Sequence, residues 1–374
     1  MTPEELIAHL LAGTSKFGAS DLHLKVGYAP YFRVAGHLRK IKEVEPFASS
    51  EFIERMMETL IPAKRRHVYD ERGALDFSAK GPTGDRYRIN VYRAGGEMHV
   101  AIRRVQSEIP SFEKLQLPPI YKKLTDEATE GLVLISGITG SGKSSTLAAM
   151  LQHINEIHSM HIITIEDPVE YLFRPVKSII SQREVGVDVP TFAEALRFMV
   201  REDPDCILIG EMRDRETMVS AIQAAETGHL VLGSLHSADT QQSFSRLLEF
   251  FPRDEHAFVR SSLANSLKAI LCQRLLPGIA EGTRVPASEV LLVNATVREK
   301  IRHEEDEDFP AIISSCVEEG MHSFTQSLAD LVEAEKVHYD TAMEFAPNRD
   351  ALKSEIKGIK TSAQSLVTRV RGKQ

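Results

Sequence analysis

Cysteine is scarce in this chain, and its three copies lie far apart. Cys206, Cys272 and Cys316 form no C-x-x-C pair anywhere in the 374 residues. Disulfide frameworks and structural zinc sites both depend on closely or regularly spaced cysteines. We therefore expect neither a disulfide scaffold nor bound zinc.

Long apolar runs are also missing. No stretch approaches the ~20 apolar residues that a bilayer-spanning helix needs. Residues 1–5 are acidic and do not resemble the start of a signal peptide. We therefore expect a cytoplasmic protein.

The chain has no surplus of positive charge. Its 53 acidic and 45 basic residues give a formal net charge of −8. A protein that works on nucleic acid normally carries a basic surface, and a single-strand translocase also needs aromatic platforms among the basic residues. Neither pattern is present, so we expect no nucleic-acid partner.

What the chain does contain is a complete phosphate-binding loop. Residues 137–144, GITGSGKS, fit the pattern G-x-x-x-x-G-K-[ST] and directly follow the apolar run 132–135. Residues 144–157 read as an amphipathic helix, whose apolar face carries Leu147, Met150, Leu151 and Ile154. A buried strand before the loop and a helix after it predict a site for a nucleoside triphosphate with Mg²⁺.

The residues of this loop have separate expected roles. Lys143 should reach the β- and γ-phosphates, and the Ser144 hydroxyl should ligate Mg²⁺. The positions expected to bind ATP are Gly137, Thr139, Gly140, Ser141, Gly142, Lys143, Ser144 and Ser145.

The first part of the chain predicts a small α+β domain over residues 1–106. Helices are expected over 3–17 and 50–61. Strand-like alternation is found at 20–24, 31–34, 74–78, 86–92 and 99–105. Residues 107–120 contain several prolines and read as a linker.

From residue 121 to about 355 the pattern becomes that of an α/β domain. Continuous apolar runs alternate with helices, which is typical of parallel strands buried on both faces. The expected strands are 132–136, 161–165, 206–209 and 230–234. Beyond about residue 241 we expect a mostly helical part, and over 356–374 a flexible tail.

Acidic residues follow two of these strands. Glu166, Asp167 and Glu170 come after 161–165, at the strand end that faces the ligand in parallel sheets. One of them could orient or deprotonate the attacking water; for Glu166 and Asp167, capping the next turn is the alternative. After 206–209, Gly210 replaces the usual Walker B aspartate, so the acidic contact with Mg²⁺ falls to Glu211.

Histidines and arginines form two further candidate groups. His229 and His236 bracket the strand 230–234 and could sense the γ-phosphate, or could be structural. Arginines in the late strands of the first domain could be a solvated sheet face, or could supply an arginine finger within an oligomer. These arginines are Arg86, Arg88, Arg93, Arg103 and Arg104.

In this order the motifs resemble the secretion ATPase superfamily, specifically the type IV pilus retraction ATPases of the PilT/PilU family. The resemblance covers nearly the whole chain. The blocks that carry it are residues 19–24, 137–144, 163–170, 181–185, 201–205, 210–214 and 227–236.

The resemblance implies a PAS-like N-terminal domain joined flexibly to a RecA-like P-loop ATPase domain, assembled as a homo-hexameric ring. ATP would bind between the domains and at subunit contacts. Carried over by residue, Glu170 is the catalytic carboxylate and Glu211 the Walker B glutamate. His229 and His236 match the family's histidine motif. Arg88 and Arg103 match arginines that approach the nucleotide, with Arg86 a weaker match.

Two departures refine this placement. Assembly ATPases carry a four-cysteine zinc motif and an extra N-terminal domain; this sequence shows neither, which favours retraction. The main retraction motor carries the motif Ala-Ile-Arg-Asn-Leu-Ile, whereas residues 295–302 read ATVREKIR, followed by the acidic run 304–308. The chain therefore resembles the accessory branch, PilU, more than the main motor. The acidic run could be a solvated loop or a docking surface for a partner ring.

The sequence thus predicts an ATPase motor of type IV pilus retraction and twitching motility, accessory to a second retraction ATPase. Its expected partners are that ATPase and an inner-membrane pilus platform protein, with the ring peripheral at the inner face of the cytoplasmic membrane. The alternative is a nucleotide-binding regulatory ring in which turnover is secondary.

Overall fold

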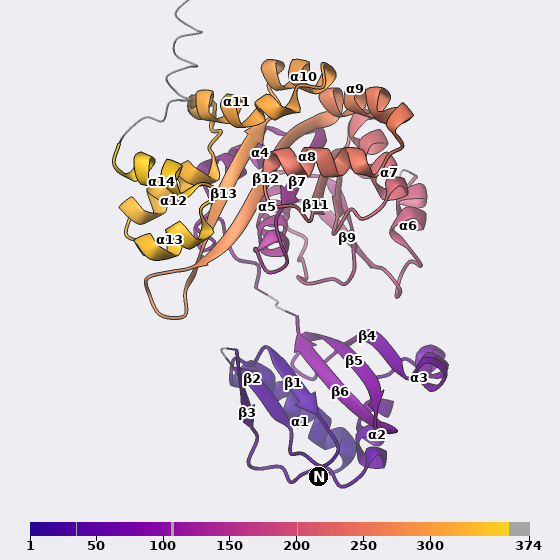
Figure 1. The fold of residues 1–374 in the computed structure, drawn as a ribbon. Coiled ribbons are helices and arrows are strands. Elements are labelled where there is room, and N and C mark those ends of the chain that lie inside the picture. The colour runs from indigo at the N-terminus through magenta and orange to yellow at the C-terminus, as the bar shows by residue number, and fades with distance from the viewer. Residues whose placement is uncertain (35, 106–107, 200, 359–374) are drawn as a thin grey trace, which may run out of the picture. The chain divides into compact units, whose positions relative to one another are not determined.

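The computed structural model describes residues 1–34, 36–105, 108–199 and 201–358 (Figure 1). Most of the expected tail, residues 359–374, lies outside this range, as do residues 106 and 107 at the start of the expected linker. The described residues form two compact units, one from the range 1–108 with 170–172 and the other from the range 109–169 with 173–358.

The first unit is built on a six-stranded antiparallel sheet of order β3-β2-β1-β6-β5-β4. Its strands are β1 (Asp21–Leu24), β2 (Tyr31–Val34), β3 (His37–Lys40), β4 (Ala74–Lys80), β5 (Arg86–Ala94) and β6 (Glu97–Arg104). Its helices are α1 (Pro3–Lys16), α2 (Ser50–Glu58), the short η1 (Ala63–Arg65) and α3 (Arg66–Arg72).

Apolar side chains of α1 and α2 pack with those of the sheet in one core. Leu10, Met56 and Ile102 are each at most 2% exposed. The Thr2 hydroxyl accepts a hydrogen bond from Glu5 N–H, and the Glu5 carboxylate accepts one from Thr2 N–H. This reciprocal cap explains why α1 begins at Pro3, as the sequence predicts.

The second unit is built on a seven-stranded sheet of order β13-β12-β7-β11-β10-β8-β9. The four strands expected from the sequence are present and pair in parallel. The strands are β7 (Gly131–Ser136), β8 (His161–Glu166), β9 (Ile179–Glu184), β10 (Cys206–Ile209), β11 (Leu230–Leu235), β12 (Leu267–Pro277) and β13 (Arg284–Leu292).

Successive residues of the central strands enter two different cores, one on each face of this sheet. In β7, Leu132 and Leu134 pack with helices α6 to α9, whereas Val133 and Ile135 pack with α4 and α5. Covering both faces with helices is the usual architecture of a mostly parallel sheet. The helices up to the hairpin are α4 (Pro119–Glu127), α5 (Lys143–Ile157), α6 (Phe192–Met199), α7 (Arg215–Glu226), α8 (Thr240–Glu249), η2 (Arg253–Glu255) and α9 (His256–Ser266).

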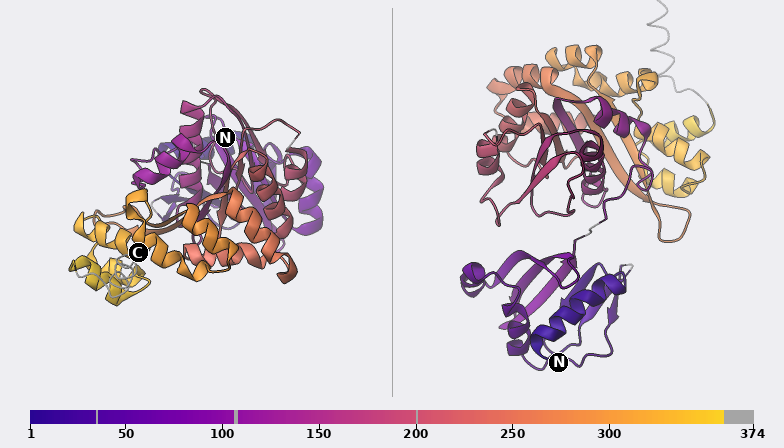
Figure 2. Two further views of the ribbon diagram at one scale, coloured as in Figure 1. Left: turned by 90° about the horizontal axis from the view of Figure 1, so that it is seen from above. Right: turned by 180° about the vertical axis from the view of Figure 1, so that it is seen from behind.

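The helices that follow β13 form the C-terminal part of the unit. The last three cluster beside the β12–β13 hairpin, and Figure 2 shows the same cluster from two other directions. These helices are α10 (Ala295–Arg302), η3 (Asp306–Asp308), α11 (Phe309–Ser315), η4 (Val317–Glu319), α12 (Phe324–Glu333), α13 (Tyr339–Phe345) and α14 (Arg349–Ile356). No helix among the described residues is both long and apolar enough to span a bilayer.

Four strands escape the sequence patterns, namely β3, β9, β12 and β13. All four residues of β3 are exposed, so no apolar alternation marks it. Strand β12 continues directly from α9 without a glycine or proline between them, which is why the chain beyond residue 241 reads as helical. The prediction of a mostly helical part beyond residue 241 is therefore incomplete, because β12 and β13 form a long antiparallel hairpin in that part.

Candidate nucleotide-binding site

The phosphate-binding loop joins the end of β7 to the start of α5. Gly142, the residue before α5, has a left-handed backbone with φ of 92°, and no side chain caps the first N–H groups of the helix. Uncapped N–H groups at a helix start carry a partial positive charge and bind anions such as phosphate. The loop therefore presents a site for a phosphate group.

Lys143 lies folded against this loop. Its ammonium group donates hydrogen bonds to the carbonyl oxygens of Gly137, at 2.7 Å, and Ile138, at 3.2 Å. The residue is only 9% exposed, while the neighbouring Ser144 is exposed at the first turn of α5. A positive charge and a hydroxyl thus stand at the same helix start.

The floor of the loop is polar and tightly packed. A Cβ on Gly137 would lie 2.4 Å from Ser141 Oγ and 2.5 Å from the carbonyl oxygen of Gln273, on β12. Ser141 Oγ and Gln273 Oε1 are both buried and have no hydrogen-bond partner among the described residues. Buried polar atoms left unpaired at such a loop suit a polar ligand. Gln273 escaped the sequence patterns; its one signal is a polar side chain within an apolar strand.

Parallel pairing brings further polar residues to the same sheet edge. Strands β8, β10 and β11 end there, so the residues after them, Asp167, Glu211 and His236, lie close together. His236 Nε2 lies 3.2 Å from Glu211 Oε1, and Arg213 Nη1 lies 3.8 Å from Asp167 Oδ2. Arg213 also donates a short hydrogen bond to Glu211 Oε2.

The carboxylate of Glu211 is held in its charged form. Burial alone would raise its pKa, but Arg213, with help from His236 and Lys143, outweighs this effect and lowers the pKa below its ordinary value of 4.5. Glu211 therefore presents a negative charge at this edge, where the sequence predicts contact with Mg²⁺. Among the described residues no group of three or more acidic, histidine or cysteine side chains could hold a metal alone. A Mg²⁺ ion would thus share its coordination with phosphate oxygens, as it usually does.

The structure supplies a physical reason for glycine at position 210. A Cβ there would lie 3.2 Å from both Glu166 Cα and the Ile165 carbonyl oxygen on the neighbouring strand. The Ser234 hydroxyl also donates a hydrogen bond to the Gly210 carbonyl, at 2.5 Å. The close approach of β8 therefore disfavours a side chain at position 210, the place of the usual Walker B aspartate.

The three acidic residues after β8 have different surroundings. Glu166 Oε1 accepts hydrogen bonds from the Thr164 hydroxyl, at 2.6 Å, and the Gln182 amide, at 3.2 Å. Glu170 is exposed, and its predecessor Val169 donates its N–H to Glu184 Oε2 at 3.3 Å. Glu184 is only 4% exposed. Gln182 and Glu184 thus fix the loop that carries Glu170, a role that their sequence block did not reveal.

One sequence candidate, His229, lies away from this edge. His229 precedes β11, at the opposite end of the strand from His236, and its Nδ1 lies 2.9 Å from the Ala224 carbonyl oxygen. Its environment is that of a residue closing the C-terminal end of α7, so the arrangement does not support a chemical role for it within this unit. Asp214, which follows Glu211 in the block 210–214, caps α7 by accepting a hydrogen bond from Thr217 N–H, at 2.8 Å.

The predicted arginines lie on the sheet of the first unit. Arg88 and Arg103 face each other across β5 and β6. Arg103 Nε lies 2.8 Å from Asp21 Oδ1, and Arg88 Nε lies 3.7 Å from Asp76 Oδ1. Burial would raise the pKa of Asp21, but Ser20 and Arg103 outweigh it and lower the pKa. Both arginine side chains keep over 40% of their surface exposed, so each combines an ion pair, close for Arg103 and longer for Arg88, with access to solvent.

The acidic run after α10 is largely paired within the unit. Asp306 lies 2.7 Å from Arg260, whose guanidinium also lies over the Phe244 ring. Asp308 and Glu305 both pair with Lys300, and together they raise its pKa. Three of the five acidic residues therefore have structural partners, which favours a structural role for the run over a docking role.

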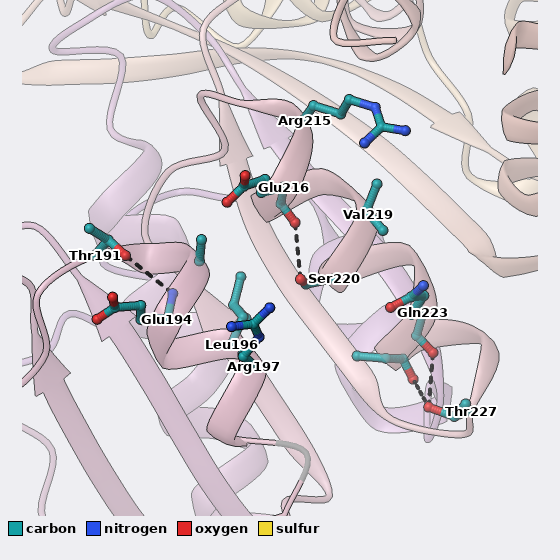
Figure 3. A pocket seen from close by; sticks show the side chains of 12 residues that line it. Thr191, Glu194, Leu196, Arg197, Arg215, Glu216, Val219, Ser220, Gln223 and Thr227 are labelled. Carbon is teal, nitrogen blue, oxygen red and sulfur yellow. Dashed lines mark hydrogen bonds between the residues drawn. The ribbon is translucent and has the colours of Figure 1, made fainter.

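The described residues also contain an open groove of about 910 Å³ between α6 and α7 (Figure 3). Its threonine hydroxyls are engaged locally: Thr191 accepts from Glu194 N–H, and Thr227 donates to backbone carbonyls of α7. It contains none of the residues expected to bind ATP, so we place the nucleotide site at the phosphate-binding loop.

Comparison with known proteins agrees with this arrangement. The profile of the family described as type II/IV secretion system protein matches residues 2–366. The chain is 38% identical to the pilus retraction ATPase PilT of Pseudomonas aeruginosa over 340 residues, 91% of this chain and 98% of that protein. It is 35% identical to the type IV pilus ATPase PilU of that organism over 356 residues, 95% of this chain and 92% of that protein. A crystal structure of the retraction motor PilT with bound ADP matches with a TM-score of 0.87 at 38% identity, covering 93% of this chain and 98% of that one.

The packing of the loop floor leads to a prediction for Gly137→Ala. The new methyl group would overlap Ser141 and Gln273, and overpacking of this kind costs about 1–3 kcal/mol. We expect binding of a fluorescent ADP analogue to weaken by roughly 10-fold or more, since about 1.4 kcal/mol corresponds to a tenfold change. The comparison variant is Gly140→Ala, which adds a side chain to a left-handed backbone with φ of 81° and so carries backbone strain, but whose Cβ meets nothing within 4 Å. A larger loss in Gly137→Ala than in Gly140→Ala therefore measures the overlap. Equal losses in the two variants would contradict the packing argument.

The lowered pKa of Glu211 predicts how its contribution to stability depends on pH. A depressed pKa means that the charged carboxylate stabilises the folded state fully above pH 4.5, and that this contribution is lost as pH falls through the lower folded value. The difference in melting temperature between wild type and Glu211→Gln should therefore be largest near neutral pH and shrink below 4.5. Glu249→Gln removes an exposed carboxylate on α8 and serves as the control. A difference for Glu211→Gln that stays constant down to pH 3 would be incompatible with the charged pair.

Proposed function

Because this chain belongs to the type II/IV secretion system protein family, and within it to the type IV pilus retraction ATPases of the PilT/PilU group, we propose that it is an ATP-hydrolysing motor of pilus retraction. One observation supports this most directly. The uncapped start of α5, Lys143 and the charged Glu211 meet at a single edge of the parallel sheet.

We assign the finer architecture on the same basis. The second unit corresponds to a RecA-like ATPase domain, since its parallel strands carry the phosphate-binding loop after β7 and an acidic residue after β10. The first unit, an antiparallel sheet with helices α1 and α2 in its core, corresponds to the PAS-like domain. The proposed boundaries are 1–106 and 121–355, with the linker 107–120 between them.

The proposed chemistry assigns one task to each residue at the edge. Lys143 and the loop N–H groups hold the β- and γ-phosphates, and Ser144 and Glu211 hold Mg²⁺, which supplies charge neutralisation at the phosphate oxygens when bound. Glu170 orients the attacking water and accepts its proton. His236, in contact with Glu211, responds to the presence of the γ-phosphate.

The remaining proposals concern the assembly. We assign a homo-hexameric ring, in which Arg88 and Arg103 of the first unit approach the nucleotide and help to neutralise the transition-state charge. Their guanidinium groups are partly exposed, and in each the atom placed near a carboxylate, at 2.8 Å for Arg103 and 3.7 Å for Arg88, is Nε, which leaves the two terminal amino groups to face a phosphate. We place the ring at the inner face of the cytoplasmic membrane, working on a pilus platform protein there.

We further propose that the motor is accessory to a second retraction ATPase. The segment 295–302 forms α10, with Val297 and Ile301 buried and Glu299 and Lys300 paired to charged neighbours. The main motor's motif Ala-Ile-Arg-Asn-Leu-Ile has a single charged residue and no carboxylate, whereas ATVREKIR has Arg298, Glu299, Lys300 and Arg302, so the helix is more highly charged here. This difference in charge at the surface of α10 suits contact with a partner other than the one that the main motor contacts.

The ATPase proposal predicts separable effects of two substitutions. Lys143→Ala should abolish nucleotide binding. Glu170→Gln should still bind ATP but lower kcat by about 10²–10⁴, the usual contribution of a general base. The matched control is Glu166→Gln at the same strand end, which should lower kcat much less because Glu166 serves Thr164 and Gln182. Full twitching motility with a hydrolysis-deficient Glu170→Gln protein would favour the regulatory ring.

The accessory role is tested in cells. Pilus retraction should persist, with reduced force or frequency, in a strain that lacks this protein, and should cease in a strain that lacks the second retraction ATPase. Retraction measured by fluorescence of labelled pili distinguishes the cases. If this protein alone sustains retraction, it is an autonomous motor and the accessory assignment is wrong.

A further inference from the structure

Residues 236–239 connect β11 to α8, and together with Thr240, the first residue of α8, they contact both the nucleotide site and the hairpin beside the C-terminal helices. We call residues 236–240 the 236–240 connection. His236 touches Glu211, at 3.2 Å. The Ser237 hydroxyl lies 2.8 Å from that of Ser136, the residue just before the phosphate-binding loop. The first two residues of this connection, His236 and Ser237, therefore contact the candidate nucleotide site.

Later residues of the connection, Ala238 and Thr240, are hydrogen-bonded to the β12–β13 hairpin. The carbonyl oxygen of Ala238 accepts a hydrogen bond from Arg274 Nη2, on β12, at 3.2 Å. The N–H and hydroxyl of Thr240 donate to Glu289 Oε1, on β13, at 2.9 and 2.8 Å. Two charged side chains thus hold the main chain on either side of Asp239, which caps α8 through Gln242 N–H.

The same two side chains also hold the C-terminal helices. Arg274 donates through Nη1 to the carbonyl oxygen of Phe345, at the end of α13, at 2.8 Å. Its guanidinium lies 4.2 Å from the centre of the Phe324 ring, at the start of α12. Glu289 Oε2 accepts a long hydrogen bond from Phe324 N–H, at 3.5 Å. Arg274 and Glu289 are therefore shared between the 236–240 connection and the helices α12 and α13.

The geometry leaves little freedom to move one side without the other. A guanidinium is planar and rigid, so its two donors, Nη2 to the Ala238 carbonyl and Nη1 to the Phe345 carbonyl, keep a fixed separation. The stacked phenylalanine restricts the tilt of that plane. Strand β12 is itself paired with β7, and its Gln273 lies beneath the phosphate-binding loop, so the hairpin offers a fixed base for this contact.

We propose that Arg274 and Glu289 are positioning residues that place His236 for the ATPase reaction and transmit the nucleotide state of the site to α12 and α13. The inference rests on the proposed ATPase function. When the contact of His236 with the site changes during turnover, the 236–240 connection shifts, and Arg274 and Glu289 pass the shift to the C-terminal helices. These helices are then the part of the unit that reports hydrolysis to its surroundings.

The test uses the full-length protein and three readouts. Arg274→Met keeps an unbranched side chain over Phe324 but removes both hydrogen bonds. Arg246→Met, an exposed arginine on α8 that lies over Phe250, is the matched control. Fluorescent ADP binding, steady-state ATPase kinetics and hydrogen–deuterium exchange of residues 324–345 are measured, the last with and without a non-hydrolysable ATP analogue and Mg²⁺.

We expect nucleotide to change the exchange of α12 and α13 in wild type and in Arg246→Met, and not in Arg274→Met. In Arg274→Met, kcat should fall by about 2- to 30-fold, the range typical of residues that couple sites, with KM changed less. Arg274→Lys keeps the charge and one donor and should recover part of both effects. Glu289→Gln should weaken the exchange response in the same direction.

Two results would overturn the proposal. One is a nucleotide-dependent exchange change in α12 and α13 that survives in Arg274→Met; the other is no such change in wild type that binds nucleotide. A wild type that binds no nucleotide would instead refute the proposed function. If Arg274→Met fails to fold, Phe324→Leu removes the ring beneath the guanidinium and is judged by the same exchange measurement.

Discussion

The parallel pairing of β7 with β11 is the constraint on which the site depends. Its register sets Ser136 opposite Leu235, so that the phosphate-binding loop and the 236–240 connection leave the sheet at one level. The pairing of β11 with β10, and of β10 with β8, brings Glu211 and the acidic residues after β8 to that level as well. The short contacts between side chains that follow these four strands depend on the backbone register. A slip of one residue in a strand would turn its side chains to the other face of the sheet and break the contacts.

Charge balance then decides how these side chains behave. A carboxylate that is largely removed from water would ordinarily favour its neutral form. Arg213 and His236 prevent this at Glu211 and so keep a negative charge where a cation is needed. The same principle operates at Asp21 in the first unit, where Ser20 and Arg103 offset burial. In both units, therefore, the residues around a carboxylate fix its charge more strongly than its depth does.

The sequence alone predicts those elements whose signal lies in neighbouring residues of the chain. The apolar runs ending at Ser136 and Ile209, and the glycines of the phosphate-binding loop, predicted the parallel strands and the site at their ends. It failed where a pattern depends on distant partners. The exposed β3 lacks alternation, β12 lacks a break after α9, and the role of Gln273 exists only because its strand runs beneath the loop. Likewise, His229 and His236 look equivalent along the chain but stand at opposite ends of β11.

The internal pairing of the acidic run has a consequence for recognition. Asp306 is engaged by Arg260, whereas Glu305 and Asp308 share the single charge of Lys300, so two positive charges offset two of the five negative charges at 304–308. The run itself keeps three negative charges, on a segment whose position those pairs hold. Their field is screened beyond a Debye length of about 8 Å in physiological salt. A protein approaching this end of the molecule would therefore meet a negative potential only at close range, and its rate of association would depend on ionic strength.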